Sequence, residues 1–327
     1  MSASFFSNLN FLPKDPIIGL TEEFNSDKRI EKINLGVGIY LNEYGLLPTL
    51  GCIKSVLNFC DFSSKGYLPI DGSRVYCDEV KKLLFGEKSN SDETIVTFQS
   101  LGGTGALRLG AELIKNSKPN TLVAISNPSW ENHRSIFESA GLNVVTYSYF
   151  DNKNMVVNIS KLIDSLKNLP EQSIVILHAC CHNPTGMDPK DSDWDEIINV
   201  VEQKKHIPFL DLAYQGFSRG IEEDANVIRK FASKIRPTFV ANSFSKSLSL
   251  YGERVGALTL VTNSIDETKK TVSNVKKIIR SNYSNPPTYG QNLVTSVLTN
   301  NDAKQLWDTE LGEMRTRIKK TRNQLVE

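Results

Sequence analysis

The stretch SIVILHACCHNPTG, residues 173–186, decides the fold, because an apolar run there ends in a cluster of polar residues. The run over 173–179 has the length and the branched side chains of a buried strand. Similar runs recur along the chain, at 121–126, 144–149, 207–212, 238–241 and 255–261. Segments with apolar residues at helical spacing separate most of them, near 131–140, 159–167, 193–205 and 224–234. This alternation predicts an α/β fold whose mostly parallel sheet is covered by helices on both faces.

Two longer segments nearer the C-terminus are predicted to be charged helices. They span 265–280 and 302–326, with apolar residues at helical spacing. The second runs to the last residues without a capping signal, so we expect the sequence to stop within an element. The segment TIVTFQ, residues 94–99, is predicted to be a short strand at most.

The composition argues against several classes of protein. Lys and Arg number 38 and Asp and Glu 37, so the chain lacks the basic excess of a non-specific nucleic-acid binder. No run approaches the roughly 18 apolar residues that a membrane helix needs. The first residues lack the features of a signal or transit peptide, and five cysteines in 327 residues are no disulfide framework. We therefore expect a cytoplasmic protein without nucleic-acid or membrane partners.

Polar clusters follow three of the predicted strands. Residues 180–186 (CCHNPTG) follow the first, Asp211 and AYQG at 213–216 come with the second, and NSFSK at 242–246 follows the third. In an open parallel sheet, ligands bind at the carboxyl ends of the strands. A glycine-rich turn, GGTGAL at 102–107, opens a helix and offers backbone N–H groups to a phosphate.

The order of glycine turn, carboxylate and lysine points to pyridoxal phosphate. This cofactor needs a phosphate site, an acid opposite its pyridine nitrogen and a lysine for its aldehyde. Asp211 can hold the ring nitrogen protonated, and Lys246 can form a Schiff base once burial and nearby cations lower its pKa. Each signal is weak alone, and their order at successive strand ends carries the prediction.

Eight motifs then resemble one known family. They are INLGVGIY, GYLPIDG, GGTGALR, SNPSWENH, HACCHNPTG, DLAYQGFSRG, NSFSKSLSLYGERVGA and RSNYSNPP. From about Pro16 to its end, the chain resembles the aspartate aminotransferases and their aromatic relatives, which are fold-type-I pyridoxal-phosphate enzymes. The resemblance implies an N-terminal arm and small-domain segment over 1–45 and a large cofactor-binding domain over 46–300. Residues 301–327 would then begin a smaller second domain that is incomplete in this chain.

The resemblance also implies the residues that hold the cofactor. Lys246 would form the Schiff base and later act as the base, and Asp211 would pair with the pyridinium nitrogen. Asn183 and Tyr214 would hydrogen-bond the phenolic oxygen, and Trp130 would stack on the ring.

Further residues would support that ring or bind the cofactor's phosphate. His133 would contact Asp211 on the side away from the cofactor and so support it. The phosphate would be bound by Gly103, Thr104, Ser243 and Arg254, together with Tyr67 of a second subunit.

Substrate contacts are implied at Gly38, Trp130, Asn183 and Arg280. Arg280 would cross the interface of a homodimer with shared active sites and grip the side-chain carboxylate of the substrate with two parallel bonds. The expected reaction moves the amino group of L-aspartate to 2-oxoglutarate by a ping-pong mechanism, giving oxaloacetate and L-glutamate. An aromatic amino-acid aminotransferase and a truncated, non-catalytic cofactor-binding protein are the alternatives.

The chain departs from the family's pattern at two points. Many members have serine where this chain has Gly102, although others have glycine. Members also continue beyond the position of Glu327, and that part carries the arginine for the α-carboxylate of the substrate. We therefore expect the sequence to be a fragment or the protein to be truncated.

Three other interpretations fail on spacing. His178, Cys180, Cys181 and His182 lack the usual zinc spacing, and neighbours on a strand point to opposite faces, so no metal is expected. SFSK at 243–246 fits S-x-x-K, but the accompanying S-D-N and K-T-G are absent from the sequence. GGTGALR lacks the G-x-G-x-x-G spacing of a nicotinamide site.

Overall fold

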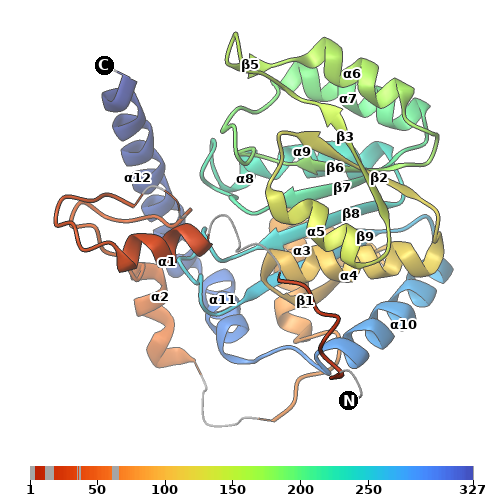
Figure 1. Ribbon diagram of the computed structural model, residues 1–327. Coiled ribbons are helices and arrows are strands. Elements are labelled where there is room, and N and C mark those ends of the chain that lie inside the picture. Colours follow the sequence, from red (N-terminus) through yellow and green to blue (C-terminus); the bar gives the residue numbers. More distant parts are fainter. Residues whose placement is uncertain (1–3, 12–17, 35, 37, 61–65, 327) are drawn as a thin grey trace. The chain divides into compact units, whose positions relative to one another are not determined.

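The computed structural model describes residues 4–11, 18–34, 36, 38–60 and 66–326, and it divides into two compact units (Figure 1). The first unit, residues 1–48, contains the helix α1 (Ile18–Ser26). The second unit, residues 49–327, contains the sheet and the other helices. Each unit is described by itself.

A seven-stranded sheet forms the centre of the second unit. Its strands are β1 (Ile95–Leu101), β2 (Leu122–Asn127), β3 (Asn143–Ser148), β6 (Ile174–His178), β7 (Ile207–Leu212), β8 (Thr238–Ser243) and β9 (Val255–Val261). They lie in the order β1-β9-β8-β7-β6-β2-β3. Only β9 runs against its neighbours, so the predicted mostly parallel sheet is confirmed. A separate hairpin joins β4 (Phe150–Asp151) and β5 (Val156–Val157).

The strand β1 is longer than its local sequence predicts. All seven of its residues pair with β9 in antiparallel register, and the hydroxyls of Thr97 and Thr259 are hydrogen-bonded at 2.9 Å. Polar residues at 97 and 99 hide the strand in the sequence, because the partner that buries them lies far along the chain. The strand predicted over 94–99 is therefore present, and it extends two residues further, to Leu101.

Helices cover both faces of the sheet (Figure 1). On one side lie α4 (Gly102–Ser117), α5 (Glu131–Ser139) and α10 (Ile265–Asn282), which share a core with alternate strand residues such as Phe98 and Phe209. The intervening strand residues, Leu210 among them, are equally buried. The helices α3 (Arg74–Phe85), α6 (Ile159–Asn168), α7 (Asp191–Gln203) and α9 (Asn226–Lys234) form the other layer.

The helix predicted near 224–234 is present in the structure. It corresponds to α9, which begins at Asn226, and the short α8 (Ile221–Asp224) precedes it. The Asp224 carboxylate at the end of α8 accepts three backbone N–H groups, at 216, 218 and 219. Short 3-10 turns lie at Leu57–Phe59 and Glu87–Ser91.

A third group of helices packs together beside the sheet. It contains α2 (Gly51–Val56), α11 (Tyr289–Thr299) and the long α12 (Asn301–Val326), which confirms the helix predicted over 302–326. The Glu310 carboxylate accepts the N–H groups of Gly51 and Cys52 and so caps α2. None of the helices that the structure describes combines the length and the apolar character needed to cross a membrane.

Candidate active site

The strand ends that the sequence singles out meet at one edge of the sheet. Both β1 and β8 run against β9, so β1 points the same way as the parallel strands. The carboxyl ends of β1, β2, β6, β7 and β8 therefore lie at the same edge as the amino end of β9. A cavity of about 220 Å³ opens there.

Nine residues predicted from the sequence line this cavity. They are Gly103, Thr104, Trp130, Asn183, Asp211, Tyr214, Ser243, Lys246 and Arg254. Five further lining residues were not predicted: Leu107, His178, Ala213, Ser245 and Tyr251. The structure thus brings six separate segments of the chain to one small volume, and the role of each residue stays a prediction.

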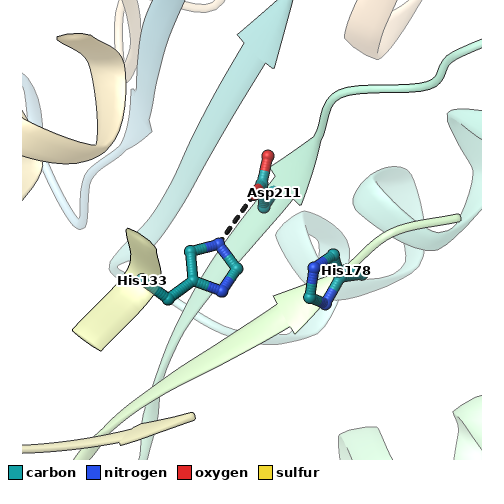
Figure 2. A group of neighbouring side chains, drawn as sticks. All are labelled: His133, His178 and Asp211. Carbon is teal, nitrogen blue, oxygen red and sulfur yellow. Dashed lines mark hydrogen bonds and ion pairs between the residues drawn. The ribbon is translucent and has the colours of Figure 1, made fainter. Parts of the chain in front are cut away.

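Asp211 lies near the end of β7 with a histidine behind it. The residue is 5% exposed, and its Oδ2 accepts a hydrogen bond from Nε2 of the fully buried His133 at 2.8 Å (Figure 2). The other ring nitrogen of His133 is hydrogen-bonded to Ser129 Oγ at 3.0 Å. This chain of contacts fixes both the position of the carboxylate and the orientation of the imidazole.

His178 lies beside this pair, because it is the residue of β6 in register with Asp211 of β7 (Figure 2). Both its ring nitrogens are buried without a hydrogen-bond partner among the described residues. Burial lowers the pKa of His178 well below its usual 6.5, and the neighbouring His133 and His182 act in the same direction, so the ring is neutral. Parallel register between 174–178 and 207–211 could have revealed this neighbour in advance.

One ligand atom from each of His133, His178 and Asp211 lies within 4.8 Å of the other two, a spacing at which the three could act as ligands of one metal ion. Two of the three atoms already form the His133–Asp211 hydrogen bond. The group that the structure describes is therefore the Asp211 carboxylate hydrogen-bonded to His133, with the neutral His178 ring alongside.

Lys246 reaches the cavity from the turn after β8. Its Nζ lies 4.8 Å from the centroid of the Tyr214 ring. Burial lowers the pKa of the amine below 10.5, Asp211 opposes this shift, and Arg254 adds to it. Burial, helped by Asp211, raises the pKa of Tyr214 to about 12, so its hydroxyl keeps its proton and can donate.

The glycine turn packs against an arginine. Gly102 has a φ of +68°, and a Cβ placed there would lie 2.6 Å from Nη2 of Arg254. Nη1 of Arg254 donates to Ser245 Oγ at 3.1 Å and to the Tyr251 carbonyl at 2.9 Å. The guanidinium thus fills the space that a side chain at 102 would take. The guanidinium and the amino end of the 16-residue α4 thus bring positive charge and backbone N–H groups to one place, as an anion requires.

Three predicted site residues do not line the cavity. Tyr67 is 92% exposed, and Arg280 is exposed at the end of α10, where its guanidinium donates to Ser284 Oγ. Gly38 belongs to the first unit. Their roles remain predictions.

A family model described as aminotransferase class I and II matches residues 30–327 of the chain. The chain belongs to this aminotransferase family. Its fold is the fold-type-I aminotransferase fold that the sequence predicted, and that prediction is confirmed.

Two curated relatives of the aminotransferase differ in the substrate for which they are named. An aspartate aminotransferase of Pseudomonas aeruginosa is 52% identical over 328 residues, which cover 99% of this chain and 82% of the relative. An aromatic-amino-acid aminotransferase of Escherichia coli is 42% identical, over 98% of this chain and 82% of the relative. The enzyme therefore belongs to the group of aspartate and aromatic aminotransferases.

A solved structure shows the same fold with a ligand. The aromatic-amino-acid aminotransferase of Burkholderia pseudomallei, covalently bound to pyridoxal phosphate, superposes with a TM-score of 0.94 at 48% identity. The match covers 98% of this chain and 82% of the other.

Proposed function

We propose that this aminotransferase moves the amino group of L-aspartate to 2-oxoglutarate, with pyridoxal phosphate attached to Lys246. The observation that carries the proposal is a half-buried amine of lowered pKa and a histidine-supported carboxylate on the walls of one cavity. Oxaloacetate and L-glutamate would be the products.

The residues present fit this cofactor. Its ring nitrogen matches the buried Asp211 carboxylate, and its phosphate matches the anion site formed by Arg254 and the start of α4. Gly103 lets the start of α4 pack closely against Ser243, because a Cβ there would lie 3.2 Å from Ser243 Cβ. When bound, pyridoxal phosphate joins an amine through its aldehyde and draws the electrons of the neighbouring C–H bond into its ring.

Lys246 would carry the proton of the reaction. A neutral amine is needed to attach the aldehyde and to take the proton from the substrate's Cα. The lowered pKa of Lys246 supplies more of that neutral form at a given pH than an exposed lysine has. Lys246 would hold the same proton and return it to the carbon on the other side of the substrate's nitrogen.

Asp211, Tyr214 and Asn183 would fix the ring and its charge. The Asp211 carboxylate, which accepts from His133, would keep the ring nitrogen protonated. Tyr214 retains its proton and would donate to the phenolic oxygen, together with the amide of Asn183. Trp130, whose ring meets His133 edge-on at 5.3 Å, would cover the face of the cofactor ring.

Arg280 and Tyr67 support a shared active site in a homodimer. Both are exposed and lie outside the cavity lining of their own chain. A second copy would bring its Arg280 to the substrate's side-chain carboxylate and its Tyr67 to the phosphate. Two-fold pairing places the same surfaces on both subunits, so each copy would complete the other's site.

Transamination of aromatic amino acids is the second candidate, because relatives named for both substrates match the chain. The test is kcat/KM for aspartate and for tyrosine, each with 2-oxoglutarate as acceptor. The proposal expects aspartate to be preferred by at least tenfold. If tyrosine has the higher kcat/KM, the proposal of aspartate as the substrate is wrong, whereas the proposed cofactor chemistry is unaffected.

A further inference from the structure

The loop that presents Asn183 to the cavity is tied down at several points. We call residues 181–188 the Asn183 loop. The Asp188 carboxylate at its end accepts the backbone N–H groups of Cys181 at 2.7 Å and His182 at 2.8 Å. The Gly186 N–H donates to the His182 carbonyl at 2.6 Å. The backbone is therefore a closed turn with His182 at its base.

The side chain of His182 is buried and fully hydrogen-bonded. The residue is 2% exposed, with Nε2 at 2.9 Å from Ser126 Oγ and Nδ1 at 2.9 Å from Thr185 Oγ1. Burial lowers the pKa of His182 to about 3, and His133 acts in the same direction, so the ring is neutral. A neutral imidazole has one donor and one acceptor, and two hydroxyl groups satisfy both in either tautomer.

A tyrosine holds the same ring from its face. The rings of Tyr149 and His182 are stacked, with centroids 3.8 Å apart and planes at 13°. The Tyr149 hydroxyl donates to the Met187 carbonyl at 2.7 Å. The Met187 N–H in turn donates to Thr185 Oγ1 at 3.2 Å. The contacts of His182, Tyr149 and Thr185 therefore restrain the Asn183 loop both at His182 and at Met187.

His182 also joins two walls of the cavity. Ser126 belongs to the end of β2, four residues before Trp130, and His182 precedes Asn183. Trp130 and Asn183 both line the cavity. The single Ser126–His182 hydrogen bond therefore fixes the end of one strand relative to the loop after another.

We propose that His182 is a positioning residue that holds the Asn183 amide at the phenolic oxygen of the cofactor. This role rests on the proposed function, because it needs the cofactor in the cavity. It explains why a buried polar ring with two hydroxyl partners lies directly before Asn183, where an apolar side chain would fill the space without these bonds.

The test uses the pH at which the visible absorbance of the bound cofactor changes. A donor to the phenolic oxygen stabilises its ionised form, so a loose Asn183 raises this midpoint. Ser126→Ala and Thr185→Val each remove one hydroxyl partner of His182 and leave the ring in place. Thr185→Val also removes the acceptor of the Met187 N–H, so Ser126→Ala is the cleaner of the two. Losing a whole hydrogen bond to a charged group, about 1.5–3 kcal/mol, would raise the midpoint by about one to two units. Because these changes only loosen Asn183, we expect each to raise it by roughly half a unit to one unit. Asn183→Ala should raise it at least as far.

A double variant separates positioning from general loosening. If His182 acts through Asn183, Thr185→Val adds no further shift in the Asn183→Ala background. His206→Asn is the matched control, because His206 is 1% exposed and bonds the Leu166 carbonyl away from the cavity. That variant should lose stability and leave the midpoint unchanged.

The outcomes distinguish the two proposals. If the wild-type protein forms no visible band with the cofactor, the proposed function itself is wrong. If the band forms and Asn183→Ala shifts it, but Thr185→Val and Ser126→Ala do not, only the role of His182 is overturned. Equal shifts with His206→Asn, or additive shifts in the double variant, would also overturn it.

Discussion

Replacing Trp307 by phenylalanine tests how α12 supports the turn that carries Lys246. Trp307 is fully buried, and its Nε1 donates to the Ser247 carbonyl at 2.6 Å. Ser247 directly follows Lys246 and is itself buried, so its carbonyl would lose this donor away from the protein surface. The substitution removes this bond and part of a large side chain in one change.

The expected loss of stability follows from these two terms. A buried carbonyl left without its donor costs about 1–3 kcal/mol. The space vacated by the smaller ring adds about 1 kcal/mol. We therefore expect Trp307→Phe to lower the free energy of unfolding by about 2–4 kcal/mol.

Urea unfolding of both proteins measures this difference. Trp194→Phe is the matched control, because Trp194 is also buried and contacts Phe231 edge-on, and its indole nitrogen makes no hydrogen bond to any described residue. The control should lose only the packing term. A loss below about 0.5 kcal/mol for Trp307→Phe, or losses equal to those of the control, would refute the role of the Ser247 contact.

Three further predictions concern the site and its histidines. Mixing Lys246→Ala with Arg280→Ala subunits should restore about a quarter of wild-type activity, because half the dimers would hold one intact site of two; no recovery would exclude sites shared through Arg280. Arg254→Gln should raise the pKa of Lys246, since Arg254 now lowers it; titration of lysine labelling would show an unchanged pKa if that contact is unimportant. The free energy of unfolding should fall as the pH drops below about 6.5. In the unfolded chain His178 and His182 then bind protons, whereas in the folded chain burial keeps both rings neutral. The slope is up to about 1.4 kcal/mol per unit for each histidine and continues for His182 towards pH 3; unfolding free energies that stay constant down to pH 4 would contradict it.

The strand ends of the site could be predicted from the sequence. Apolar runs ending at Asp211, before Asn183 and before Lys246 are local patterns, and parallel strands bring their ends to one edge. The structure places all three residues on one cavity. The resemblance to a known family added Trp130 and Arg254, which no local pattern singles out.

Contacts between distant segments could not be predicted. The length of β1 depends on pairing with β9, about 160 positions later. The fit of Arg254 against Gly102 depends on a side-chain conformation, and the bonds of His182 to Ser126 require the folded sheet. Sequence patterns describe single elements, whereas these features arise only from packing between them.

The proposed chemistry depends on attachment of the cofactor to Lys246. The most direct measurement incubates the protein with pyridoxal phosphate, reduces it with borohydride and maps the modified lysine by mass spectrometry of its peptides. We expect one modified residue, Lys246, and protection of that residue when aspartate is added before the reduction. Modification confined to other lysines, or the same pattern in Lys246→Ala, would contradict it.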